Sequence, residues 1–129
     1  MYRYAKKSLF KAVVNLVKGV NLSWINKGVK YPKIDLHSWI ENTPTDKEQS
    51  VREISFIVEA CSNTSYEQAV DMADQISQKL CNDYASLVVE DAEVISVYPD
   101  GSEEIEEQDN NNVVLYRQLN RLVVTIKTK

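Results

Sequence analysis

The single histidine, His37, follows Asp35 by two residues and directly precedes Ser38. A serine–histidine–carboxylate triad needs an oriented imidazole and a nucleophile held on a strained turn. The chain has no Gly-x-Ser-x-Gly motif, and Asp35 and His37 on a strand would share a face without an evident serine partner. We therefore interpret His37 as a partly exposed structural histidine.

Carboxylates form two further candidate sites. The run Glu90-Asp91-Ala92-Glu93 resembles a metal or general-acid cluster, but neighbours on a strand point to opposite faces and do not converge on one atom. The acidic segment 102–112 has almost no apolar residues, so we expect a mobile loop that does not hold ligands with catalytic accuracy. We expect neither site to bind a metal.

Glycine and cysteine usage restricts the chemistry further. The three glycines lie too far apart for a dinucleotide fingerprint or a Walker-type phosphate loop, and we expect no cofactor and no enzymatic activity. Cys61 and Cys81 have no CxxC spacing. We place them at the two ends of one helix, about 24 Å apart, which predicts two free thiols.

The charge of the chain is unevenly distributed. Residues 1–34 contain eight basic residues and no acidic one, whereas the remainder contains seven basic and nineteen acidic residues. A basic stripe on the first helix could bind nucleic acid, a membrane or an acidic protein surface, or be an ordinary solvated face. The pI of about 5.0 and the lack of an aromatic stacking platform near the stripe argue against a free nucleic-acid binder. The stripe consists of Arg3, Lys7, Lys11 and Lys18.

Hydrophobic periodicity predicts the elements that would position these residues. Residues 3–19 should form an amphipathic helix whose apolar face packs into the core rather than onto a membrane. Short strands are expected at 29–32, ended by a proline, and within 34–40, with a polar turn at 43–48. Apolar residues alternate over 51–60, which predicts a strand, and Thr64 with Glu67 has the spacing of a capping box at the start of a helix ending near 82.

The last third of the sequence predicts strands at 87–89, 92–98 and 115–127, with Pro99-Asp100-Gly101 as a turn before the acidic loop. Short connections favour a single α+β domain, residues 1–129. This domain would be a two-layer sandwich, with a mostly antiparallel sheet and two helices packed on one face. Trp24, Tyr31 and Trp39 would be interface anchors or would cover the sheet edge, with Trp39 leaning toward the core. No apolar run is long enough to span a membrane, and we expect no secretory signal.

This order of elements resembles the tail-completion and tail-terminator proteins of long-tailed bacteriophages. The resemblance rests on the opening helix Lys6 to Gly19, the strand Ile54 to Glu59 leading into the helix Tyr66 to Ile76, the strand Ala92 to Tyr98 and the terminal strand Tyr116 to Lys127. It implies a hexameric ring at the head-proximal end of the tail tube, with the tail-tube and head-connector proteins as partners and DNA passing through the lumen. It also implies a location in the virion tail, reached by assembly in the host cytoplasm.

Within such a ring, each subunit presents two different surfaces to its neighbours. We expect the basic stripe to face the next subunit's acidic segment, or in part to line the lumen. The alternatives are a stand-alone small-molecule-binding or regulatory α+β domain of a bacterial cell and a metal-dependent hydrolase. The residues expected at the subunit interface are Arg3, Lys7, Lys11, Lys18, Glu103, Glu104, Glu106 and Glu107.

Overall fold

A computed structural model describes residues 4–18, 31–42 and 51–128 of the 129-residue chain. The helices are α1 (Lys6–Lys18) and α2 (Tyr66–Asn82), and a short 3-10 turn, η1, covers Tyr84–Ser86. The strands are β1 (Lys33–Glu41), β2 (Val51–Ser62), β3 (Val88–Val89), β4 (Ala92–Gln108) and β5 (Val114–Thr128). The predicted turn at 43–48, together with Trp24, Val29 and Lys30, lies outside the described residues.

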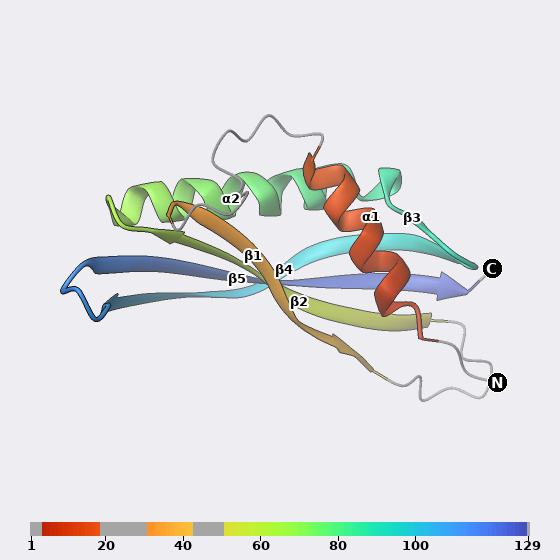
Figure 1. The fold of residues 1–129 in the computed structure, drawn as a ribbon. Helices are drawn as coiled ribbons and strands as arrows, with labels where there is room; N and C mark the ends of the chain where they lie inside the picture. The colour runs from red at the N-terminus through yellow and green to blue at the C-terminus, as the bar shows by residue number, and fades with distance from the viewer. Residues whose placement is uncertain (1–3, 19–30, 43–50, 129) are drawn as a thin grey trace.

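The described strands form a sheet in the order β1-β2-β5-β4-β3, and each neighbouring pair is antiparallel. Both helices lie on one side of this strongly twisted sheet (Figure 1). The side facing them, called the helix side below, carries a continuous apolar cluster; we call the other side the open face. The expected α+β fold with two helices on one face is therefore confirmed. The cluster includes Leu9 and Val13 of α1, Phe56 of β2, Ile76 of α2 and Val124 of β5.

Strand β1 differs from the two short strands expected here. Its strand pairing starts at Lys33, directly after Tyr31 and Pro32, so Pro32 precedes β1, and the first half of the strand expected at 29–32 lies outside the described residues. The register with β2 shifts between His37 and Ile40, where Ser38 has a left-handed backbone (φ 58°). Such a bulge reverses the alternation of side chains. As a result Trp39 turns to the helix side and stacks on Phe56, with ring centroids 4.2 Å apart.

Most of the acidic segment, residues 102–108, is part of strand β4 and not of the mobile loop expected from its composition, and residues 109–112 lie in the connection between β4 and β5. β4 runs through Pro99 and pairs with β5 from Ser102↔Asn120 to Gln108↔Val114. The predicted turn at 99–101 is instead an irregularity within β4, where Gly101 adopts a φ of 97° that other residues rarely adopt. The prediction of a loop was wrong because it used side-chain composition alone. A lack of apolar residues excludes burial in the core, but antiparallel pairing uses backbone N–H and C=O groups, which every residue except proline carries in full.

A buried carboxylate holds the start of α1. The Glu41 carboxylate accepts hydrogen bonds from the backbone N–H groups of Ala5, at 2.8 and 3.1 Å, and of Lys6, at 2.8 Å. Arg52 Nη1 lies 3.1 Å from the same carboxylate, and the Glu41 side chain is fully buried. Backbone N–H groups at a helix N-terminus lack intrahelical partners. Glu41 therefore acts as a long-range cap that fixes α1 to the edge strand β1.

Helix α2 begins one residue later than its predicted capping box. Ser65, rather than Thr64, is the N-cap, and its Oγ accepts a hydrogen bond of 3.1 Å from the Gln68 backbone N–H. Ser65 and Gln68 have the same three-residue spacing as Thr64 and Glu67. Two overlapping motifs thus fitted the sequence, and only the entry of the chain from β2 selects between them.

Candidate functional site

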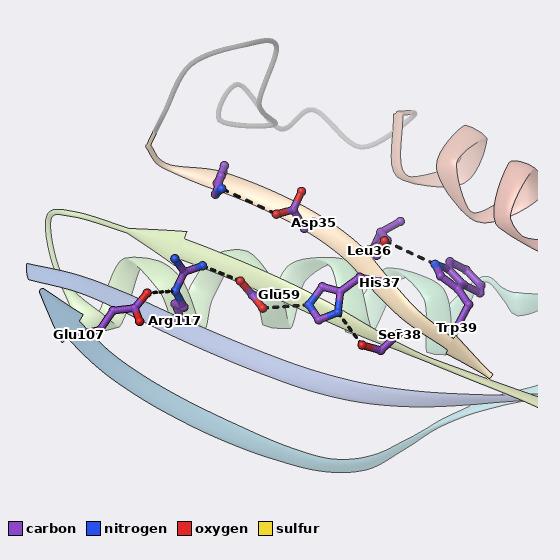
Figure 2. A network of polar contacts seen from close by, with 9 residues as sticks. Asp35, Leu36, His37, Ser38, Trp39, Glu59, Glu107 and Arg117 are labelled. Carbon is purple, nitrogen blue, oxygen red and sulfur yellow. Dashed lines mark hydrogen bonds and ion pairs between the residues drawn. The ribbon is translucent and has the colours of Figure 1, made fainter. Parts of the chain in front are cut away.

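The open face carries a polar network that crosses four strands (Figure 2). Glu59 of β2 joins two side chains, accepting hydrogen bonds from Arg117 Nη1 at 2.7 Å and from His37 Nε2 at 2.8 Å. Arg117 of β5 also donates from Nε to Glu107 of β4 at 2.6 Å. Burial disfavours the charged guanidinium, but the hydrogen bonds to Glu107 and Glu59 outweigh it and raise the pKa of Arg117. The network thus ties β1, β2, β5 and β4 together with a cation that stays charged.

His37 sits between two oxygens rather than beside Asp35, which instead lies near Lys33. Glu59 accepts from Nε2, so Nδ1 of a neutral ring accepts from the Ser38 hydroxyl, 2.8 Å away. The expectation that no serine would reach the imidazole is therefore wrong. Ser38 reaches it because the bulge changes its direction, which strand alternation does not predict. This serine belongs to a bulge of an edge strand and not to a strand–helix turn. It orients the His37 ring, which links β1 to β2 through Glu59.

In the acidic run at 90–93, Glu90 and Asp91 form the turn between β3 and β4, with Asp91 at φ 59°, and Ala92 and Glu93 begin β4. The Glu90 backbone N–H donates to Ser8 Oγ of α1 at 2.9 Å. Over residues 4–18, 31–42 and 51–128, no three histidine, cysteine or acidic side chains group as metal ligands. The run therefore has a visible role in linking this turn to α1.

The predicted interface residues fall on two separate parts of the molecule. Lys7 and Lys11 are exposed on α1, Lys18 ends that helix, and Arg3 and the Lys18 side chain lie outside the described residues. The β4–β5 hairpin that carries the acidic residues extends at the end of the sheet opposite to α1 (Figure 1). Within one subunit, the basic and acidic groups are thus separated.

The four acidic residues do not act as one patch. Glu104 and Glu106 oppose Gln118 and Tyr116 of β5 on the helix side, whereas Glu103 and Glu107 oppose Leu119 and Leu115 on the open face. The hydrogen bond that the Tyr66 hydroxyl of α2 donates to Glu104 raises the pKa of Tyr66. Since Glu107 is paired with Arg117, two of the four expected interface acids already have partners within the subunit, which the sequence did not indicate.

A groove between α2 and the β4–β5 pair was not predicted. It has a volume of about 660 Å³, and its lining includes Asp74, Cys81, Ser102, Gln118 and Asn120. The two amide side chains are 6% and 7% exposed, and they lie where apolar residues would otherwise continue the core of β5. Alternating polar residues near the start of the last strand were the only sequence signal for it.

Hydrogen bonds connect the groove floor to α2. Asn120 Nδ2 donates to Asp74 Oδ1 at 3.0 Å and to Ser77 Oγ at 3.1 Å, and Gln118 Nε2 donates to Asn120 at 2.8 Å. The Tyr66 hydroxyl lies 3.0 Å from Gln118 Oε1 and also reaches Glu104, so its single proton is shared between two acceptors. This arrangement fixes the position of Asp74 in the groove.

Both cysteines are free, as predicted. Cys61 is buried on the open face, and Cys81 is half-buried at the groove. Burial raises the pKa of both thiols, which opposes formation of the reactive thiolate. In the part of the chain that is described, no helix is long and apolar enough to cross a membrane.

Comparison with known proteins gives a likeness of fold. No protein-family model and no curated protein matches the chain. Among solved structures, a chain of the "Virion of native gene transfer agent (GTA) particle" is similar to this one, with a TM-score of 0.73 and 12% identical residues. The match covers 97% of this chain and 99% of the other. Nearly the whole of this chain therefore has the fold of a chain found in that particle.

Proposed function

We propose that this protein is a structural subunit of a phage-like virion and makes or breaks no bond. The observation that carries the proposal is the similarity to a chain of a gene transfer agent virion over 97% of this chain and 99% of that one. The similarity therefore extends over nearly the whole of both compared chains. The resemblance of the sequence to tail-completion proteins points to the same class of particle.

More specifically, the protein forms a hexameric ring on the head-proximal end of a tail tube. The ring ends tube polymerisation and presents a surface to the head connector. The distribution of charge supports a ring, because Lys7 and Lys11 lie on α1 and the acidic residues lie on a hairpin at the other end of the sheet. Complementary surfaces at two ends of a subunit make head-to-tail contacts, which close into rings when the rotation allows it. Such a subunit would assemble in the host cytoplasm and remain in the virion tail, with DNA passing through its lumen.

The decisive test uses the tail-tube protein encoded by the same genome. Tubes polymerised in the presence of this protein should carry a ring on one end in electron micrographs and should stop elongating. Capsid, connector, tube and tape-measure genes flanking its own gene would agree with this result. Tubes that keep growing without end-bound particles, or metabolic genes as neighbours, would contradict the proposal.

The groove of about 660 Å³ favours one other candidate function, a small-molecule-binding domain. A ligand that binds only the folded state stabilises it by an amount that grows with the logarithm of the ratio of ligand concentration to Kd, and so raises the melting temperature. A thermal-shift screen with metabolites that finds a saturable increase, together with a monomer that does not bind tubes, would favour this second function.

A further inference from the structure

We infer that the groove between α2 and β4 receives the Lys7–Lys11 face of α1 from a second copy of this chain. The inference rests on the ring proposed above and names the surface through which one subunit holds the next. The acceptor is centred on Asp74 of α2, which the sequence did not single out, with Glu104 of β4 beside it.

The first observation is a carboxylate without a cation. Among the described residues, Asp74 is the only charged one that lines the groove, and it is half-buried there. Its contact is the neutral amide of Asn120, and it forms no ion pair with any side chain in the described residues. Partial burial of a carboxylate costs free energy that an opposite charge offsets. The groove therefore suits a cationic side chain.

The second observation is the chemistry of the surrounding wall. The groove is lined by oxygen acceptors in addition to Asp74, namely the side chains of Tyr66, Ser77, Ser102 and the two amides of β5. Glu104 and Glu106 line the helix side of β4 just beyond it. An ammonium group has three donors and no acceptor, so such a wall satisfies a lysine better than it satisfies an anion.

The third observation identifies the donor. Lys7 and Lys11 are one helical turn apart on the exposed side of α1, and neither pairs with a described acidic residue. No described side chain of α1 lines the groove of its own subunit. A contact between these two surfaces is therefore made between copies, and repetition of the same contact generates a ring.

Charge substitutions test the contact. Association between copies is measured by analytical ultracentrifugation and by ring counts on tube ends. The double variant Lys7→Glu/Lys11→Glu should abolish rings, and Asp74→Asn should weaken association by about tenfold while keeping an acceptor for Asn120. The matched controls are Lys127→Glu and Glu93→Gln, two exposed residues that oppose each other on the open face. Circular dichroism and thermal melting of each variant verify its fold.

A cross-link provides a second readout. Cys81 lines the groove and is a free thiol, so Lys11→Cys on one copy should form a cross-link to Cys81 of another through a short bismaleimide. Cys81→Ala should remove that product, and Lys127→Cys should not form it. Differently tagged copies show that the product joins two chains.

The outcomes separate the two proposals. Rings that form with both lysines reversed, or cross-links that form equally from Lys127→Cys, overturn the groove contact and leave the ring intact. A wild-type protein that neither self-associates nor binds tube ends overturns both. Loss of association in the lysine and Asp74 variants but in neither control supports the contact.

Discussion

Removal of the Glu41 carboxylate should weaken the attachment of α1 to the sheet and destabilise the fold. The fully buried carboxylate accepts from the backbone N–H groups of Ala5 and Lys6 and pairs with Arg52, which is also buried. Loss of an N-cap costs about 1 kcal/mol, and breaking a buried ion pair by removing one partner costs about 3–5 kcal/mol. Because one carboxylate makes both sets of contacts, these costs overlap, and we expect Glu41→Ala to lower the free energy of unfolding by about 4 kcal/mol.

Urea denaturation followed by circular dichroism measures this loss. With an m-value of about 1.5 kcal/mol/M, the midpoint should fall by roughly 2.7 M. Glu41→Gln keeps the size and an acceptor oxygen, so it should be affected less. The double variant Glu41→Met/Arg52→Met should be more stable than Glu41→Ala, because it leaves no buried guanidinium beside an apolar side chain.

Glu93→Ala is the matched control, since Glu93 is exposed on the same sheet and should change stability by less than about 0.5 kcal/mol. A Glu41→Ala variant within 1 kcal/mol of wild type would refute the reasoning, because it would mean that α1 is held by its apolar face alone. The same result would show that Glu41 does not set the orientation of α1, and therefore does not set the direction in which Lys7 and Lys11 point.

Three further perturbations test the fold and the groove. Phe56→Ala removes a fully buried ring that stacks on Trp39, and it should cost about 3–5 kcal/mol in urea denaturation. The added Cβ of Gly101→Ala meets no atom within 4 Å, but the backbone φ of 97° is strained for an alanine. The melting temperature of this variant should therefore fall by an amount equivalent to about 1 kcal/mol. An unchanged melting temperature would contradict the positive φ at this position. Glu104→Gln should lower the pKa of Tyr66 toward its usual value, measured as the ultraviolet titration difference between otherwise identical chains with and without Tyr66→Phe. Because the pKa of Tyr66 is raised in the folded state, the stability that the Tyr66–Glu104 hydrogen bond contributes is fully present below the pKa of the unfolded chain. It is lost as pH rises through the folded-state pKa of Tyr66. A Tyr66 titration that does not change in Glu104→Gln would contradict the contact.

Hydrophobic pattern determined those elements whose burial alternates. In β2, Ile54, Phe56, Val58 and Ala60 are all fully buried, as their alternation predicted. In α1, the predicted face containing Leu9 and Val13 is buried, and Lys7 and Lys11 are exposed. The physical reason is that a period of 2 or 3.6 residues places side chains on one face whatever the rest of the chain does.

Pattern failed where pairing partners decide the conformation. Residues 102–108 are exposed throughout and carry no periodic signal, yet β5 pairs with them residue for residue. The register shift at Ser38 turned one residue toward the imidazole of His37 and the next, Trp39, toward the core. A bulge of this kind depends on pairing with the neighbouring strand, and the pattern of residues within β1 alone does not predict it.

The sequence by itself determined the α+β class, the two amphipathic helices, the free cysteines and the separation of basic from acidic residues along the chain. Only the tertiary structure decided which charges meet across the sheet, because those ion pairs join residues that are distant in sequence, such as Glu59 and Arg117. It paired Glu107 with Arg117, placed Glu41 under α1, and left Asp74 beside an amide in a groove formed by α2, β4 and β5. Side-chain chemistry is encoded locally, but the partner of each charge is set by strand register and by the packing of helices on the sheet.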